Sequence, residues 1–275
     1  HDLSMLTGYC AGWSLKQLIQ EGLGGIEGKI TSKPAKHLST LCNQMVNFLG
    51  IMQNEWAGAQ AFSSFDTYLA PFIKIDNLEY HQVKQCIQSF VYGVNTPSRW
   101  GTQAPFTNIT LDWTVPNDLA ELNCLIGGKE VDFKYKDCKK EMDMVNKAFL
   151  EIMIEGDANG RGFQYPIPTY SITKDFDWSA TENNKLLFEM TSKYGTPYFS
   201  NYINSDMEPS DVRSMCCRLR LDLRELRKKS GGFFGSGEST GSVGVVTINM
   251  PRIAYLSKNE AEFYERLDHL MDISA

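Results

Sequence analysis

Two adjacent cysteines, Cys216 and Cys217, are the residues whose type and spacing point most directly to chemistry. They lie in the run Ser-Met-Cys-Cys-Arg-Leu-Arg at 214–220. Neighbouring cysteines seldom form a disulfide with each other, because the small ring strains the peptide bond between them. Each thiol is therefore available to react alone or with a partner elsewhere, unless both are simply small, buried packing residues.

Three other short segments accompany this pair. They are Tyr-Cys-Ala-Gly-Trp-Ser at 9–14, Phe-Gln-Tyr-Pro-Ile-Pro-Thr at 163–169 and Gly-Val-Val-Thr-Ile-Asn-Met-Pro-Arg at 244–252. Together, and in this order, the four segments resemble the catalytic subunit of the anaerobic (class III) ribonucleoside-triphosphate reductases. These are oxygen-sensitive glycyl-radical enzymes that make deoxyribonucleotides. The resemblance extends over essentially the whole chain.

The resemblance implies a role for each cysteine of the motifs. Family members carry a Met-x-Cys-Arg sequence whose cysteine holds a thiyl radical that abstracts the 3′-hydrogen of the ribose. The match places the thiyl on Cys217, with Met215 beside the substrate. The formate-oxidising branch has Asn-Cys on the first barrel strand and Gly before the radical cysteine, whereas this chain has Tyr9-Cys10 and Cys216. That departure implies the thiol-dependent branch, in which Cys10 and Cys216 close a disulfide that a thioredoxin- or glutaredoxin-like protein reduces; the alternative is that Cys216 only packs.

Four further features are candidates for substrate contacts. A thiol-dependent enzyme needs a carboxylate for acid–base work on the sugar hydroxyls, and Glu238 is the candidate, although a solvated loop carboxylate is an equal alternative. Tyr9 either donates a hydrogen bond near the sugar or belongs to the core. Thr169, which we expect at the end of a barrel strand, is a candidate phosphate contact. The Gly-rich run 231–237 either presents backbone amides to a triphosphate or only lets the chain turn.

The resemblance also implies cofactors and partners. The family uses a glycyl radical near the C-terminus, generated by an Fe–S/S-adenosylmethionine activating enzyme. ATP or deoxynucleotide effectors bind between long helices at a homodimer interface, and segments 36–57 and 79–92 fall in the corresponding stretch. Residues 53–62, rich in amides and small side chains, are either an effector or subunit contact or a helix end packing on the barrel.

Composition narrows the class of protein. The chain has 275 residues, of which 42% are hydrophobic and 22% charged, as in soluble globular proteins. A net charge of −6 argues against binding nucleic acid through its phosphates, and neither a membrane span nor a signal peptide is visible. Seven cysteines, an odd number, indicate reduced thiols in a cytoplasm. The absence of a C-x-x-C spacing argues against a zinc site.

Hydrophobic spacing predicts an α/β fold. Helical periodicity covers 36–57, 79–92, 139–155, 182–194 and 258–272, and short strands are expected at 107–113, 163–170, 198–203 and 243–250. Alternating strands and helices predict a mostly parallel sheet. The resemblance implies half of a ten-stranded α/β barrel, threaded by a central finger loop at about 204–242 that carries the radical cysteine. One strand of the second half, 243–250, would follow it.

The two ends of the chain predict a fragment. It opens at His1 and stops at Ala275 without a capping signal. We therefore expect 1–275 to be a single catalytic barrel fragment without the N-terminal regulatory and C-terminal glycyl-radical regions, inactive by itself. Two alternatives remain. Another glycyl-radical enzyme, a lyase or dehydratase, would not need a dithiol pair, and a non-catalytic module would bind ATP or dATP through residues near 36–60.

Overall fold

A computed structural model describes residues 8–24, 28, 30–97, 103–207, 212–214, 220–222, 240–242 and 246–274. The chain divides into two compact units, His1–Ser242 and Val243–Ala275. The larger unit contains the main sheet and most of the helices, and the smaller unit contains two helices.

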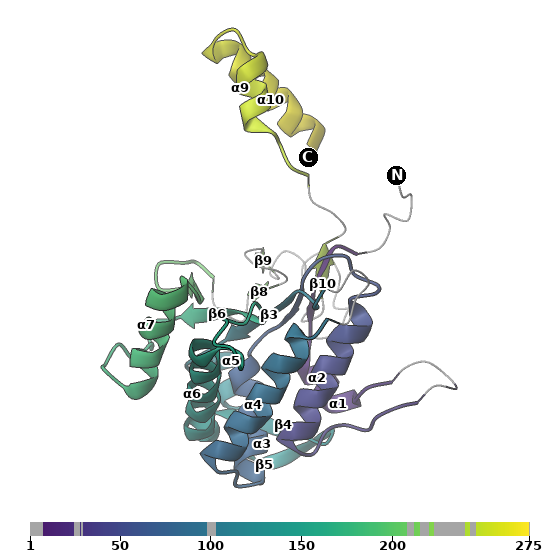
Figure 1. Cartoon of the computed structure of the whole chain (residues 1–275), viewed down its shortest axis with the longest axis vertical. Helices are drawn as coiled ribbons and strands as arrows, with labels where there is room; N and C mark the ends of the chain where they lie inside the picture. The colour runs from purple at the N-terminus through teal and green to yellow at the C-terminus, as the bar shows by residue number, and fades with distance from the viewer. Residues whose placement is uncertain are drawn as a thin grey trace. The chain divides into compact units, whose positions relative to one another are not determined.

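The main sheet of the larger unit has six strands in the order β10-β1-β2-β3-β6-β7. Five strands of this sheet, β1, β2, β3, β6 and β7, run parallel to one another, and β10 runs antiparallel to β1. The five parallel strands therefore follow one another in chain order around a curled sheet (Figure 1). This is the α/β half-barrel that the sequence predicted. The bounds are β1 (Cys10–Trp13), β2 (Gln60–Phe62), β3 (Thr107–Leu111), β6 (Ile167–Ile172), β7 (Tyr198–Asn201) and β10 (Thr240–Ser242).

Helices connect successive strands and cover one face of this sheet (Figure 1). Strand side chains such as Phe62, Ile109 and Tyr170 join helix side chains in one hydrophobic core. Between β3 and α6 the chain also forms a two-stranded antiparallel hairpin of β4 and β5. The bounds are α1 (Leu15–Glu21), α2 (Leu38–Met52), α3 (Phe65–Ile75), α4 (Tyr80–Asn95), α5 (Asn117–Ala120), β4 (Asn123–Ile126), β5 (Lys129–Lys134), η1 (Tyr135–Cys138), α6 (Lys139–Glu155) and α7 (Glu182–Tyr194).

The region predicted as a finger loop, about 204–242, is described only in part. β8 (Val212–Ser214) pairs antiparallel with β9 (Arg220–Asp222). Residues 215–219, which include the cysteine pair, lie outside the described residues, as do 223–239.

The predicted strand 243–250 is wrong in its described part: residues 243–245 lie outside the described residues, and 246–249 form no strand. The strand that pairs antiparallel with β1 is Thr240–Ser242, and a helix, α9 (Met250–Leu256), begins where the predicted strand would end. The Asn249 side chain accepts a hydrogen bond from the backbone N–H of Arg252 at 2.9 Å, and Pro251 lies in the first turn. Both features favour a helix start. After α9, the smaller unit continues as α10 (Glu260–Ser274).

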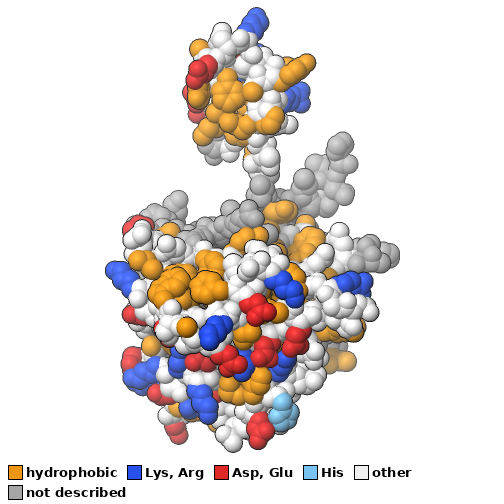
Figure 2. Space-filling model, turned by 60° about the vertical axis from the view of Figure 1, so that its left-hand side comes forward, with side chains coloured by type: hydrophobic (Ala, Val, Ile, Leu, Met, Phe, Trp, Pro, Cys, Tyr) orange, Lys and Arg blue, Asp and Glu red, His pale blue; other side chains and the backbone are white. Residues whose placement is uncertain are grey.

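Two surface features can be followed in Figure 2. On the face shown, acidic and basic side chains are interspersed over the larger unit, and the smaller unit presents a group of hydrophobic side chains. Exposed side chains of the smaller unit include Tyr255, Tyr264 and Ile273. Within the described part of the chain, no helix is both long and apolar enough to cross a membrane.

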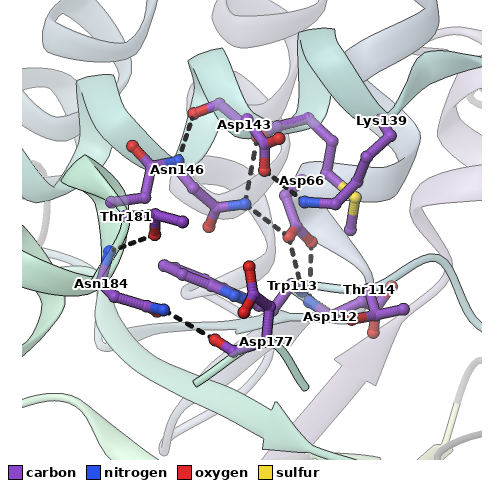
Figure 3. A network of polar contacts seen from close by, with 12 residues as sticks. Asp66, Asp112, Trp113, Thr114, Lys139, Asp143, Asn146, Asp177, Thr181 and Asn184 are labelled. Carbon is purple, nitrogen blue, oxygen red and sulfur yellow. Dashed lines mark hydrogen bonds and ion pairs between the residues drawn. The ribbon is translucent and has the colours of Figure 1, made fainter. Parts of the chain in front are cut away.

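A buried carboxylate holds the carboxyl end of β3 (Figure 3). Asp66, at the start of α3, is fully buried and accepts hydrogen bonds from the backbone N–H groups of Thr67 (3.1 Å), Asp112 (2.8 Å) and Trp113 (3.0 Å). The side-chain amide of Asn146, on α6, donates a fourth bond at 2.9 Å. Burial raises the pKa of Asp66, and these four donors oppose that effect. One side chain thus joins α3, α6 and the end of β3.

We expect Asp66→Ala to lower the free energy of unfolding by about 2–4 kcal/mol, because it leaves buried N–H groups without an acceptor. Urea unfolding measures the change. Asp143→Ala is the matched control, since Asp143 on α6 is 45% exposed and its side chain pairs with Lys139; we expect a change within about 0.5 kcal/mol. Equal effects of the two substitutions would contradict the structural role of Asp66.

Candidate functional site

Cys10 lies on the face of the main sheet opposite the helices. Paired residues across parallel strands point to the same side, and Gly12 pairs with Ala61, Ala61 with Asn108 and Asn108 with Ile167. Along each strand, every second residue points to the same side. One face of the sheet therefore carries Cys10, Gly12, Ala61, Asn108, Thr110, Thr169 and Ser171. We call this the Cys10 face. The alternate residues, among them Phe62 and Ile109, enter the helix-side core.

The backbone holds Cys10 from both neighbouring strands. Its thiol is buried, with the residue 3% exposed, and Sγ accepts a hydrogen bond from the backbone N–H of Ala59 at 3.3 Å. On the other side, the backbone N–H of Cys10 donates to Ser242 Oγ at 3.3 Å. Cys10 and Ala59 form a small hydrophobic cluster separate from the main core. The sulfur is therefore fixed beside the chain that enters β2, while β10 holds the backbone of Cys10 from the other side.

Three glycines allow this close packing. A Cβ atom at Gly58 would lie 2.6 Å from Cys10 Sγ and 2.5 Å from Tyr9 O. Cβ atoms at Gly8 and Gly241 would lie within 2.5 Å of the Trp56 ring. Trp56 itself stands edge-on to Trp13 of β1, with ring centroids 5.6 Å apart. These contacts pack the turn that follows α2 against β1 and β10, whereas residues 60–62 of the predicted segment 53–62 form β2. A role of this segment in effector or subunit contact stays a prediction.

Four residues predicted to act in the site lie outside the described residues. They are Met215, Cys216, Cys217 and Glu238. The flanking chain is described in part: it leaves the sheet after β7, at one edge, and returns as β10, which pairs with β1 at the opposite edge. Ser242 of β10 is the register partner of Cys10. The segment that contains Cys216 and Cys217 thus rejoins the sheet directly beside Cys10.

The remaining two predicted site residues lie at different distances from Cys10. Tyr9 directly precedes it, is 41% exposed, and its backbone N–H donates to Ser242 O at 2.7 Å. Thr169 was expected at the end of a strand, but β6 runs over Ile167–Ile172, so Thr169 lies in its middle. It shares the Cys10 face but stands three strands away, about 14 Å across the sheet. The structure therefore does not bring Thr169 next to Cys10.

Sequence reasoning missed the polar residues of β3 on the Cys10 face. Asn108 is 2% exposed, and within the described ranges neither its side-chain oxygen nor its nitrogen has a hydrogen-bond partner; Thr110 Oγ1 is likewise buried without one there. The sequence Thr-Asn-Ile-Thr-Leu at 107–111 did contain a signal. Polar residues at 108 and 110 alternate with Ile109 and Leu111, which indicates a strand with one polar face.

The other described cysteines belong to the helix side of the sheet. Cys42, Cys124 and Cys138 are buried in the main core. The sulfurs of Cys124 and Cys138 are 3.9 Å apart, within reach of a weak hydrogen bond, and burial raises the pKa of Cys42. Within the described ranges, no group of three or more His, Cys, Asp or Glu side chains is arranged to hold a metal ion. Cys10 therefore differs from these three thiols in lying on the opposite face.

We expect Gly58→Ala to lower the free energy of unfolding by about 1–3 kcal/mol, because the new methyl group overlaps Cys10 Sγ and the backbone of Tyr9. Thermal unfolding measures this effect. Gly50→Ala is the control, since a Cβ there meets nothing within 4 Å and α2 gains helix propensity of up to about 1 kcal/mol. A neutral Gly58→Ala variant would mean that Cys10 is not held as tightly as described.

Comparisons with solved structures show the fold. The chain is similar to the anaerobic ribonucleotide reductase from Thermotoga maritima in complex with dATP and CTP, with 24% identity and a TM-score of 0.69 over 98% of this chain and 43% of that chain. With dATP bound in the specificity site, the Thermotoga maritima enzyme matches at 22% identity and a TM-score of 0.70, over 98% of this chain and 44% of that one. This chain thus spans less than half the length of those structures.

Comparison by sequence shows the family. No curated protein matches the chain. In contrast, the family described as anaerobic ribonucleoside-triphosphate reductase matches residues 1–275, the whole of the sequence. The half-barrel and the match over its full length agree with the resemblance carried by the four motifs. The chain belongs to the anaerobic ribonucleoside-triphosphate reductase family.

Proposed function

We propose that the protein containing this chain reduces ribonucleoside triphosphates to deoxyribonucleoside triphosphates by a thiyl-radical mechanism. Cys217 is the radical residue, Cys10 and Cys216 are the reductant pair, and Met215, Tyr9 and Thr169 contact the nucleotide. The 275 residues alone are expected to be inactive, because the family's glycyl-radical region lies outside them.

The electron balance of the proposed reaction requires two thiols. The Cys217 thiyl takes the 3′-hydrogen, and the 2′-hydroxyl leaves as water with a proton from the pair. Cys10 and Cys216 together supply two electrons and two protons and end as a disulfide, and the 3′-hydrogen returns from Cys217. The net change is one ribonucleotide and two thiols to one deoxyribonucleotide, one water and one disulfide. Glu238 is the proposed acid–base group for the sugar hydroxyls.

The position of Cys10 carries this proposal. Its sulfur is buried on the face opposite the helices, and β10, its antiparallel neighbour, ends the segment that contains Cys216 and Cys217. A disulfide requires Cα atoms roughly 4.4–6.8 Å apart, and a chain segment anchored beside Cys10 is suited to reach that separation. The membership of the whole chain in the reductase family supports the same assignment.

The proposal includes several partners. An Fe–S/S-adenosylmethionine activating enzyme would generate the glycyl radical that charges Cys217. A thioredoxin- or glutaredoxin-like protein would reduce the Cys10–Cys216 disulfide by thiol exchange. ATP and deoxynucleotides would act as effectors on a homodimer through the helices near 36–57 and 79–92. The thiol chemistry suits a reducing cytoplasm.

We expect Cys217→Ala in the activated full-length protein to abolish deoxynucleotide formation, and Cys10→Ala to abolish multiple turnover. The reason for the second effect is that no disulfide can form at position 10. Deoxynucleotide formed per enzyme, with a thioredoxin system as reductant, measures both effects. Cys86→Ala is the control, since Cys86 is a half-buried thiol on the helix side, next to the main core.

The same experiment separates the alternatives. A glycyl-radical lyase or dehydratase would keep its activity when Cys10 is replaced, because such reactions consume no dithiol. A non-catalytic nucleotide-binding module would be indifferent to loss of Cys217. Sustained turnover by Cys10→Ala would therefore refute the reductant assignment while leaving a radical enzyme in place.

A further inference from the structure

Asn108 has a buried side-chain amide. The residue is 2% exposed, and among the described residues neither its donor nor its acceptor has a hydrogen-bond partner. On the same strand and face, Thr110 Oγ1 is also buried and has no partner in the described part of the chain. Buried polar groups in folded proteins are almost always hydrogen-bonded, and an unpaired one costs free energy. Such a group is expected where a ligand supplies the missing partners.

The chemistry of the Cys10 face restricts which part of a ligand it can take. Among the described strand residues on this side of the sheet, the polar side chains are neutral: Asn108, Thr110, Thr169, Ser171, Tyr198, Ser200, Thr240 and Ser242. No lysine or arginine belongs to this described set. A triphosphate is usually bound by cations or by clustered backbone N–H groups. The neutral amides and hydroxyls of this face therefore suit an uncharged part of a nucleotide.

Strand geometry places Asn108 at a nucleoside's length from Cys10. Asn108 stands two strands from Cys10 and two residues further along, which corresponds to about 12 Å between Cα atoms. The two side chains project from the same face of the sheet at the two ends of this span, and a ribose with its base has a comparable length. With the ribose beside Cys10, Asn108 is level with the base.

We infer that Asn108 hydrogen-bonds the base of the substrate nucleotide. This inference rests on the proposed function, because it takes Cys10 as the group beside the ribose. The side-chain amide offers an acceptor and a donor side by side, which matches the donor and acceptor pairs on the edges of nucleobases. Because the carboxamide can present either atom by rotation, one asparagine serves bases with different edges. Thr110, the next residue along this face, is the neighbouring candidate contact.

The test compares cytidine triphosphate with ribose 5-triphosphate, which lacks the base, on the full-length protein. Wild type should bind cytidine triphosphate at least tenfold more tightly, measured by calorimetry. Asn108→Ala and the similarly sized Asn108→Leu should reduce the ratio of the two affinities by about fivefold or more. The main reason should be weaker binding of cytidine triphosphate, the ligand that has the base. In turnover, KM for cytidine triphosphate should rise while kcat changes little.

Thermal unfolding without ligand separates a binding role from a structural one. Asn108→Leu should leave the Tm unchanged or raise it, because it removes an unpaired buried amide. Asn146→Ala is the matched control: this fully buried amide donates to Asp66 and to Met142 O, so its loss should lower the Tm and leave the ligand ratio unchanged.

Each contrary result has a distinct meaning. If the Asn108 variants bind both ligands more weakly by the same factor, or bind both as the wild type does, the proposed base contact is wrong while the reductase proposal stands. If Asn108→Leu lowers the Tm as much as Asn146→Ala does, the amide is structural and the inference fails. A wild-type protein that neither binds nor reduces cytidine triphosphate would overturn the proposed function, and this inference with it.

Discussion

The Asp66 carboxylate is the interaction on which the arrangement of the larger unit depends most. Its two oxygens accept four N–H donors, which come from the start of α3, the end of β3 and the middle of α6. Trp113 has a φ of 64°, unusual for a residue other than glycine. Its N–H is held by Asp66, and its ring stacks on Phe176 at 5.5 Å. A carboxyl group buried with all its hydrogen-bond partners thus fixes where β3 ends and which helices cover it.

A second constraint operates at the other end of the sheet. The main chain around Cys10 approaches that of residues 57–59 so closely that only glycine fits at position 58. On the other side of β1, β10 pairs with it and provides hydrogen-bond partners for its backbone. The edge of the half-barrel is thereby closed by the returning chain rather than left unpaired. Because the sulfur packs against residues 58 and 59, small changes in packing there act directly on the proposed reductant.

The sequence predicted the parts of the fold that have a clear period and missed those that do not. The amphipathic helices at 139–155 and 182–194 agree with the structure, as do the parallel strands near 107 and 198. α3 went unpredicted because its residues Phe65 to Ile73 are all buried and include Pro71, so it shows no polar side. β2 has only three residues. Cys10 was found through its motif, whereas Asn108 was not, because its lack of a partner appears only once neighbouring strands are placed.

β3 and the residues that directly follow it carry two kinds of buried polar group, those with a hydrogen-bond partner and those without one among the described residues. At its carboxyl end, the backbone N–H groups of Asp112 and Trp113 have found a buried acceptor, and that end is fixed by the protein alone. In its middle, the Asn108 amide and the Thr110 hydroxyl oxygen are buried and have no hydrogen-bond partner among the described residues. Packing could have supplied an apolar side chain at either position, as it does at Ile109 and Leu111 on the opposite face. A strand that carries such groups at a fixed distance from a buried thiol is suited to bind a ligand without reorganising, because the cost of burying those groups is met by the fold itself.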